Sequence, residues 1–559
     1  MSTAYQLLLK LDVSDLEAAA SAWGSLARKL ETAHKDHRRH VTGPLSAWEG
    51  DSAKAGKPVL EQLQGQLEAA HVDAILIITV LDTTRVAMKQ AQTDLRNAIK
   101  SAERDDYIID DTTGQVSLPK WLIDARHDPD QATVLPEYTK AMTGHQDKIN
   151  QAVKDAKKAS DDGEKAIGEV RAQLLDEEDA LGQTAVEARD VTKDLGIGPY
   201  GIPDGKDVKE NAEWWKHLGH DEQQMYIAMY PKQIGGLDGL PTVARDDANR
   251  LLLDQYLNPA PPEHSINPDV FNKQQDGLKA LKKKLDAADG APKGRELYLL
   301  KLRPEGDGRA IVAMGNPDTA KNTAVLVPGV NSDLEGTGGE IDRIDALQGA
   351  AMRSAPGDST AVISWLDYDP PNEKIPDLDL DIGVISQDRA KEGGETLRHF
   401  TEGTRAAQGG HHSNLTVIGH SYGSTTVGAG AAGGHGLGAD NIVAVGSPGM
   451  TVEHAKDLNI DPKHVFIGSA KDDPIINNFA GTALGADTRN QTFGAQNFKV
   501  DTSGHSGYWG YIDNNPSESL TNQGRIITGY PPSTVPPRNP DHYSGGIANP
   551  FPNVPQGIK

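Results

Sequence analysis

The chain has 559 residues, a formal net charge of −24 and no cysteine. This length predicts two or three domains rather than one hydrophobic core, and the lack of cysteine excludes disulfides, cysteine nucleophiles and thiolate metal ligands. The acidic balance argues against nucleic acid or an anionic membrane surface as a main partner.

Neither the N-terminus nor the longest early apolar run has the pattern of a targeting or membrane segment. Residues 1–13 lack a basic region followed by a long apolar core, so no Sec signal peptide is expected. The run Val72–Leu81 is too short and too interrupted to span a bilayer. We therefore expect a soluble chain with no transmembrane segment, either cytoplasmic or exported by a non-Sec route.

The first third of the chain has the periodicity of long helices. Apolar residues recur every three or four positions from Ser14 to Thr42, which predicts an amphipathic helix with Ser14 as its N-cap. Gly43-Pro44 ends it, and further helical stretches run from about Ser52 to Ala102 and from about Glu137 to Glu187. We assign residues 1–195 to an α-helical bundle or hairpin.

A block rich in tryptophan and glycine follows the helical region. Trp214-Trp215 supplies an apolar anchor, and the stretch from Ile234 to Arg250 places a glycine turn between two helical patterns. We predict a helical clamp or linker over residues 205–290, which packs the helical region onto the rest of the chain.

Short apolar runs separated by turns begin at Glu296 and predict an α/β domain. Helical patterns lie between most of the runs, so the sheet should be mostly parallel with helices on both faces. The first two runs should form an antiparallel hairpin at one edge. We assign residues 295–525 to this domain and 530–559 to an irregular, proline-rich tail. The predicted strands are Leu297–Leu302, Ala310–Met314, Ala324–Val327, Ala361–Trp365, Leu415–Ile418, Ile442–Val445, His464–Ile467 and Phe498–Val500.

A serine in a sharp strand-to-helix turn is the main candidate for chemistry. The strand Leu415–Ile418 runs into Gly419-His420-Ser421-Tyr422-Gly423, and a helix of small residues follows. Glycines on both sides of Ser421 remove side chains that would clash in so tight a turn. This pattern predicts a nucleophile elbow with Ser421 at its apex, and we expect His420, held inside the turn, to point away from Ser421.

The loops after later strands supply an acid and a base in the chain order Ser, Asp, His. Functional groups gather at the carboxyl ends of parallel strands, which here carry Asp473 and His505. The imidazole would take the serine proton, and the carboxylate would orient the imidazole. Asp472 remains an alternative acid. Backbone N–H groups of Tyr422 and Val330 are the predicted oxyanion donors.

No cofactor or metal is expected. Gly428–Gly433 matches the dinucleotide fingerprint, but it lies within the helix after the turn, so close packing of that helix on the sheet explains it better. Lysine and arginine neighbours would repel a cation from three regularly spaced histidines, His34, His37 and His40. A solvated loop is expected around the acids Asp333, Glu335 and Glu340.

The second half of the chain resembles the α/β-hydrolase domain proteins of unknown function that are common in actinobacteria. The resemblance covers residues 205–515 and implies the α/β-hydrolase fold and a Ser-Asp-His triad, without supplying a substrate. It rests on Val327–Ser332, Trp365-x-x-Tyr368-x-x-Pro371, Gly419–Gly423, Gly446–Gly449, the Asp473 loop, His505-x-x-Tyr508 and the stretch from Ile234 to Arg250.

The helical region resembles the small helical-hairpin proteins of type VII secretion. Trp48-Glu49-Gly50 joins two long helices, and Tyr107-x-x-x-Asp111 after the second helix resembles the Tyr-x-x-x-Asp/Glu export signal of those proteins. This likeness implies export by a type VII-like route.

These patterns predict a serine hydrolase that cleaves an ester or amide bond through an acyl-Ser421 intermediate. The expected substrate is a small-molecule or lipid ester, and the N-terminal helices are expected to mediate self-association or to hold a partner. The alternative is a non-catalytic interaction protein or a type VII-exported protein, in which the helical region acts and the hydrolase domain is a scaffold.

Overall fold

The computed structural model describes residues 3–45, 48–124, 131–173, 201–257, 268–371 and 386–539, and the side chains of residues 131–132, 171–173 and 268–273 lie outside this description. The chain folds as two compact units. We call Met1–Ile202, Leu218–Pro231 and Asp254–Ser265 the helical unit, and Pro203–His217, Lys232–Leu253 and Ile266–Lys559 the sheet unit. The four-part division drawn from the sequence stays a prediction.

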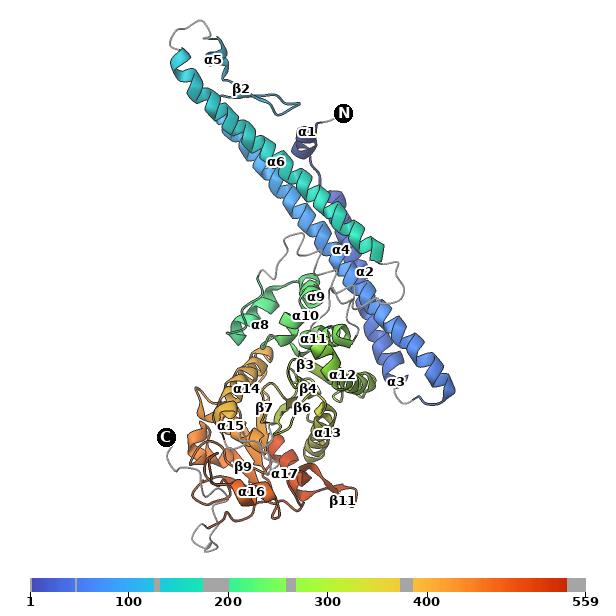
Figure 1. The fold of residues 1–559 in the computed structure, drawn as a ribbon, viewed down its shortest axis with the longest axis vertical. Helices are drawn as coiled ribbons and strands as arrows, with labels where there is room; N and C mark the ends of the chain where they lie inside the picture. Colours follow the sequence, from blue (N-terminus) through green and yellow to red (C-terminus); the bar gives the residue numbers. More distant parts are fainter. Residues whose placement is uncertain are drawn as a thin grey trace. The chain divides into compact units, whose positions relative to one another are not determined.

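The helical unit is built around two long helices, α4 (Asp51–Arg104) and α6 (Gln131–Gln173), which lie side by side (Figure 1). A third helix, α2 (Ser14–His37), also packs on α4. The other elements of this unit are α1 (Ala4–Leu9), the π-helical turn η1 (Arg38–Thr42), α3 (Gly43–Leu45), the hairpin of β1 (Ile108–Ile109) and β2 (Val116–Ser117), α5 (Lys120–Asp124) and α9 (His220–Met229).

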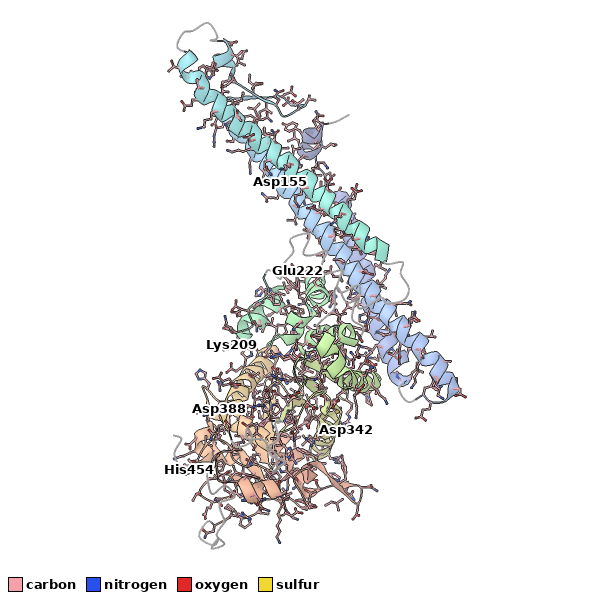
Figure 2. The ribbon with its side chains drawn as sticks, in the orientation of Figure 1. Asp155, Lys209, Glu222, Asp342, Asp388 and His454 are labelled. Atoms are coloured by element: carbon pink, nitrogen blue, oxygen red, sulfur yellow. The ribbon has the colours of Figure 1, made fainter. Side chains whose placement is uncertain are left out.

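Small side chains allow the two long helices to approach each other closely. A buried cluster contains Ala91 and Ala98 of α4 together with Ala152 of α6. The outward faces carry charge: Asp155, labelled in Figure 2, is exposed on α6 and accepts a hydrogen bond from Gln151 at 2.7 Å. Packing of these inward faces, rather than helix propensity alone, stabilises such long helices.

The apolar run Val72–Leu81 lies in the middle of α4 and is buried at every position except Ile78. A helix that is apolar on all sides belongs in an interior, and α2, α6 and α9 all contact α4. Over the described ranges, no helix is long and apolar enough to cross a membrane.

Two helix boundaries differ from the sequence prediction. Ser14 is the first residue of α2 rather than its N-cap, because Val13 occupies that position and the Ser14 N–H bonds Asp12 Oδ1 at 2.9 Å. The third long helix, α6, begins at Gln131 rather than near Glu137, and it contains Pro136. Packing of α6 on α4 outweighs the hydrogen bond that a proline removes. The predicted end at Glu187 lies outside the described residues.

The sheet unit contains an eight-stranded sheet in the order β10-β9-β8-β7-β5-β6-β4-β3. Strands β5 to β10 pair in parallel, whereas β4 is antiparallel to both β3 and β6. The strands are β3 (Leu297–Arg303), β4 (Arg309–Met314), β5 (Asn322–Val327), β6 (Thr360–Trp365), β7 (Asn414–His420), β8 (Asn441–Val445), β9 (Val465–Gly468) and β10 (Gln496–Phe498). A mostly parallel sheet with an antiparallel edge hairpin confirms the predicted fold class.

Helices cover both faces of the sheet. Helix α13 (Thr337–Ser354) contacts α17 (Glu518–Ile527), α14 (Asp388–Ala407) contacts α15 (Tyr422–Ala432), and Figure 1 shows the two pairs on opposite sides of the strands. Strands buried on both faces read as continuous apolar runs, which is why they were recognisable in the sequence. The remaining helices of this unit are α8 (Val208–His217), α10 (Pro231–Gly236), α11 (Thr242–Leu257), α12 (Pro268–Ala288) and α16 (Pro474–Phe479).

Buried ion pairs attach the 234–250 block to the sheet. Asp238, just before α11, accepts Arg245 at 2.9 Å and His399 of α14 at 3.0 Å. Lys301 of β3 lies 3.8 Å from Asp238 and 2.6 Å from Asp367, which follows β6. Burial raises the pKa of Asp238, but the cations of Arg245 and Lys301 outweigh it and hold that pKa well below the usual range. The block is therefore an integral part of the sheet unit.

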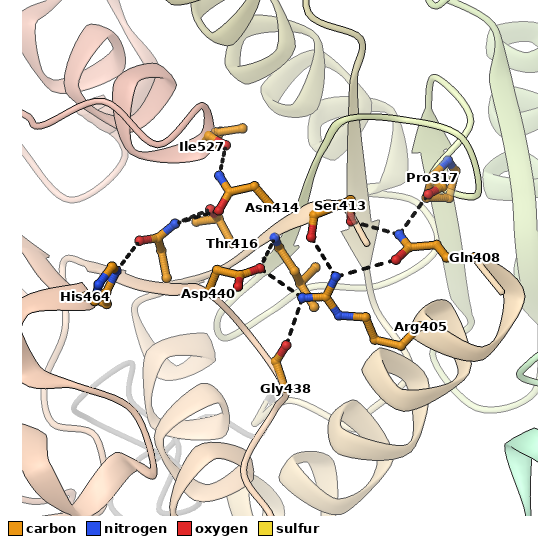
Figure 3. A network of polar contacts seen from close by, with 12 residues as sticks. Pro317, Arg405, Gln408, Ser413, Asn414, Thr416, Gly438, Asp440, His464 and Ile527 are labelled. Carbon is orange, nitrogen blue, oxygen red and sulfur yellow. Dashed lines mark hydrogen bonds and ion pairs between the residues drawn. The ribbon is translucent and has the colours of Figure 1, made fainter. Parts of the chain in front are cut away.

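A polar network fixes the amino end of β7, the strand that leads to Ser421 (Figure 3). Arg405, near the end of α14, donates to Ser413 O at 2.6 Å and to Gly438 O at 3.0 Å. It also pairs with Asp440 at 2.9 Å, and the same carboxylate accepts the Leu415 N–H at 2.7 Å. The network joins α14, β7 and the start of β8, so it sets where β7 begins.

Helix α15 packs on β7, as expected, and its glycines also let backbone outside the sheet approach. A Cβ added at Gly428 would lie 2.1 Å from Met450 O, in the loop after β8. The backbone of α14 also comes close, since a Cβ at Gly394 would lie 2.5 Å from Gly430 N. The fingerprint-like glycines are therefore packing positions between helices and a loop.

We predict that Gly428→Ala destabilises the sheet unit even though alanine favours helix. The Met450 carbonyl must move, and overpacking of this kind costs about 1–3 kcal/mol. The matched change Gly339→Ala in α13 meets no atom within 4 Å, so it should leave stability unchanged or raise it by up to about 1 kcal/mol. Urea unfolding of both variants beside the natural chain measures the difference. Equal stability of Gly428→Ala and the natural chain would contradict this packing argument.

Candidate active site

The turn at Ser421 has the backbone geometry of a nucleophile elbow. Strand β7 ends at His420, α15 begins at Tyr422, and Ser421 between them has φ 54° and ψ −131°. That conformation is strained for a residue with a side chain. A Cβ at Gly419 would lie 2.4 Å from Ser424 Cα, and one at Gly423 would lie 2.2 Å from Val327 O. Only glycine fits at either position.

Hydrogen bonds hold the strained turn against the neighbouring strand. The Ser421 N–H donates to Val445 O, the last residue of β8, at 3.0 Å. The Ser421 carbonyl accepts from Ser424 N–H at 2.9 Å and from Ser424 Oγ at 2.6 Å. Ser424 Oγ also lies 2.7 Å from Ser447 Oγ in the loop after β8. The position of Ser421 is thus tied to the end of β8.

Asp473 and His505 form an acid–imidazole pair in which the acid is buried and the imidazole is partly exposed. His505 Nδ1 lies 2.8 Å from Asp473 Oδ2 and 2.9 Å from Oδ1, while Asp473 is fully buried at the N-cap of α16. A carboxylate at Nδ1 assigns the proton to that nitrogen and leaves the Nε2 lone pair available. Among the described residues, Nε2 of His505 is buried without a hydrogen-bond partner.

Further donors keep the Asp473 carboxylate ionised. Oδ1 accepts the Ile475 N–H at 2.9 Å, and Oδ2 accepts the Tyr508 hydroxyl at 2.6 Å. Burial alone would raise the pKa of Asp473, but the hydrogen bonds from His505 and Tyr508 outweigh it and hold that pKa below the usual range. A carboxylate in this state can orient the imidazole and stabilise its protonated form.

The two adjacent acids have different partners. Asp472 Oδ1 accepts the backbone N–H of Gly504 at 2.9 Å, one residue before His505. Asp473 contacts the imidazole itself. Asp472 therefore supports the loop that carries His505, and Asp473 faces the ring.

His420 supports the same loop, which the sequence did not reveal. Its Nε2 donates to the carbonyl of His505 at 2.8 Å, and the two rings lie 4.8 Å apart. Trp509 also packs edge-on against His420, with ring centroids 4.9 Å apart. Burial and the nearby His505 lower the pKa of His420 to about 3, so this side chain is neutral near pH 7.

Ser421 and His505 both lie near the carboxyl end of β8. Within the described part of the chain, no hydrogen bond joins His505 Nε2 to Ser421. Val445 holds the Ser421 N–H, and the next residue, Gly446, lies under the imidazole: a Cβ there would be 3.1 Å from His505 Cε1. Hydrogen bonds between a nucleophile and its base are often long until substrate binds.

The predicted oxyanion donors flank the serine. Tyr422 is the first residue of α15, where backbone N–H groups have no partner inside the helix. Val330 follows Gly329, whose absent Cβ would be 2.8 Å from Ser421 Cβ, so that loop lies against the serine. The Tyr368 hydroxyl donates to Pro328 O at 2.7 Å and fixes the loop.

The other candidate ligands do not converge on a metal site. Within the described ranges, no group of three or more His, Asp or Glu side chains has the arrangement of metal ligands. Glu340 corrects our expectation of a solvated acidic loop, because it is buried in α13 and pairs with Arg343. Burial raises the pKa of Glu340.

Comparison with known proteins defines the class of this domain. A family described as alpha/beta hydrolase matches residues 303–483, a span that contains Ser421 and Asp473 and ends before His505. With the sheet order and the helices on both faces, this match shows an α/β-hydrolase domain preceded by a long helical region.

Uncharacterized mycobacterial proteins are similar to this chain. Protein Rv2079 of Mycobacterium tuberculosis (strain H37Rv) is 28% identical over 582 residues, which cover 93% of this chain and 85% of that protein. Protein Mb0988c of Mycobacterium bovis is 28% identical over 210 residues, 36% of this chain and 73% of that protein. The family match supports a hydrolase class, and the likeness of the helical region to type VII secretion proteins stays a prediction.

We predict that the free energy of unfolding of His420→Gln falls less steeply than that of the natural chain as the pH is lowered. The unfolded chain binds a proton at this histidine below about pH 6.5 and the folded chain only near pH 3, so its stabilisation is complete above pH 6.5 and falls as pH drops. Between pH 6 and 4 the variant should show a smaller slope of unfolding free energy, by about 1 kcal/mol per pH unit. Urea unfolding at several pH values measures the slope.

The control for this prediction is His412→Gln, which changes an exposed histidine of the same unit and should keep the slope of the natural chain. Identical slopes for His420→Gln and the natural chain would contradict the assignment of a neutral, buried imidazole.

Proposed function

We propose that the sheet unit is a serine hydrolase that cleaves an ester or amide bond through an acyl-Ser421 intermediate. The observation that carries this proposal is that a strained Ser421 and an Asp473–His505 pair follow the parallel strands β7, β9 and β10 of one sheet, with β8 between β7 and β9. A small-molecule or lipid ester is the proposed substrate.

The first half-reaction forms the acyl-enzyme. Ser421 Oγ attacks the substrate carbonyl carbon while His505 Nε2 takes the hydroxyl proton, and the negative charge develops on the carbonyl oxygen. The backbone N–H groups of Tyr422 and Val330 are the proposed donors to that oxygen. When the tetrahedral intermediate collapses, His505 returns the proton to the leaving alcohol or amine.

The second half-reaction releases the acid. A water molecule gives its proton to His505 Nε2 and attacks the acyl carbon, and the Ser421–acyl bond breaks as the serine oxygen regains the proton. Asp473 remains ionised throughout and stabilises the imidazolium that appears twice in the cycle. The reaction consumes one water and needs no cofactor.

The type VII-like motifs have local structural explanations in the helical unit. Trp48 lies against Gly56, where a Cβ would be 2.7 Å from the indole ring, and Gly50 has φ 98° at the start of α4. Tyr107 is buried and donates its hydroxyl to Tyr138 O at 3.0 Å. Export by a non-Sec route, and self-association or partner binding through the helices, stay predictions.

We predict that a fluorophosphonate probe labels the native chain at Ser421. The probe phosphonylates serines that an adjacent base activates, with fluoride as the leaving group, so Ser421→Ala should lose the label and heat-denatured protein should not acquire it. Ser359→Ala, which changes a serine that follows Gly357-Asp358, should keep full labelling. Mass spectrometry of labelled peptides identifies the site. No labelling of native protein, or equal labelling of Ser421→Ala, rejects the enzyme and favours a scaffold.

We predict a large difference between the two neighbouring acids. Asp473→Asn places an amide against His505 Nδ1 and favours the wrong tautomer, so the labelling rate should fall by a factor on the order of 10³–10⁴. Asp472→Asn keeps an oxygen that can accept the Gly504 N–H, so its rate should change by less than about tenfold. Time courses of probe labelling for both variants give the rates. A larger loss of rate in Asp472→Asn than in Asp473→Asn would assign the acid to Asp472.

A further inference from the structure

Tyr508 contacts the candidate acid directly. It lies in η5 (Gly507–Trp509), a 3₁₀ helix of one turn, three residues after His505. Its side chain is fully buried. Its hydroxyl donates to Asp473 Oδ2 at 2.6 Å, a short distance that is typical of a phenol bound to a carboxylate. The same carboxylate oxygen lies 2.8 Å from His505 Nδ1.

The direction of the phenol proton follows from a second contact. The backbone N–H of Ala470 donates to the Tyr508 hydroxyl oxygen at 3.2 Å, which occupies a lone pair and leaves the phenol's own proton for Asp473. Burial and the hydrogen bond to Asp473 raise the pKa of Tyr508, so the phenol is neutral and remains a donor.

The backbone of Tyr508 is anchored as firmly as its side chain. Its carbonyl accepts Ser519 Oγ and Gln523 Nε2, both of α17 and both at 3.0 Å. The ring, the acid and the base meet over Gly446, where a Cβ would lie 3.1 Å from Tyr508 Cε2, 3.1 Å from His505 Cε1 and 3.2 Å from Asp473 Oδ2. The absence of a side chain at the end of β8 makes room for all three.

We propose that Tyr508 is a positioning residue for the reaction, which holds the Asp473 carboxylate toward His505 and sets how strongly that carboxylate attracts the imidazolium. This role rests on the proposed function, because it acts through the base that activates Ser421. Tyr508 acts on the reaction through its contact with Asp473 and not through contact with the reacting atoms.

The role has a consequence for pH dependence that a merely structural tyrosine would not have. A hydrogen bond from the phenol draws negative charge from Asp473, so removing it leaves a carboxylate that stabilises protonated His505 more strongly. Protonated His505 cannot act as a base. The acid limb of the rate profile should therefore move to higher pH when the hydroxyl is removed.

The test is the rate constant of Ser421 labelling by a fluorophosphonate in Tyr508→Phe, measured from pH 5 to 9. We expect the rate at neutral pH to fall about tenfold, as for loss of a hydrogen bond to a charged group, and the acid limb to shift upward. Tyr511→Phe, an exposed tyrosine on the same segment, should change neither quantity. A uniform loss of labelled protein at every pH, with an unmoved limb, overturns the proposal.

Two further measurements keep the outcome decisive. If Tyr508→Phe does not fold, 3-fluorotyrosine at this position keeps the ring and strengthens the hydrogen-bond donor, so the acid limb should move to lower pH. An unmoved limb overturns the proposal.

The second measurement is the low-field proton resonance of His505 Nδ1, which can be recorded without catalysis. Tyr508→Phe should shift this resonance, whereas Tyr511→Phe should not. If the probe does not label the natural chain but the resonance still shifts in Tyr508→Phe, the hydrolase is rejected and the positioning contact is kept. If the probe labels the natural chain but neither the acid limb nor the resonance changes in Tyr508→Phe, only the positioning role is rejected.

Discussion

The left-handed backbone of Ser421 is the constraint on which the rest of the sheet unit depends. Such a conformation costs on the order of 1–3 kcal/mol and persists only when surrounding structure enforces it. Here β5 leaves no space for a side chain at Gly423, and β8 holds the Ser421 N–H through Val445. The network around Arg405 fixes the first residues of β7, and the strand in turn fixes the position of Ser421 at its other end.

The second constraint is the burial of charge beside that turn. A fully buried carboxylate is costly unless its lone pairs are used, and Asp473 accepts bonds from a helix N-terminus, a phenol and an imidazole. The Asp238 cluster solves the same problem with the cations of Arg245 and Lys301, and it contains none of the groups that change protonation in the proposed reaction. The contrast is physical: fixed cations suit a structural anion, whereas neutral donors leave Asp473 able to respond to His505.

The fold and the candidate residues were largely predictable because they depend on local pattern. Buried strands read as apolar runs, and Ser421, Asp473 and His505 each follow one of them. The support for these residues was not predictable, since it depends on tertiary contacts. His420 reaches the carbonyl of His505 from another strand, and only the fold distinguishes Asp472 from Asp473. The start of α6 at Gln131 was not predictable for the same reason, because packing on α4 outweighs Pro136 as a local helix breaker.

The extent of similarity bears on how the two halves of the chain work. An alignment that covers 93% of this chain and 85% of Rv2079 includes most of both units, so the helical unit accompanies the hydrolase domain in that relative. The side chains proposed for catalysis, Ser421, Asp473 and His505, all belong to the sheet unit. Self-association or partner binding through the helical unit therefore stays our proposal for its contribution. Within that unit, the Tyr107 hydroxyl donates to Tyr138 O, and Trp48 packs against Gly56.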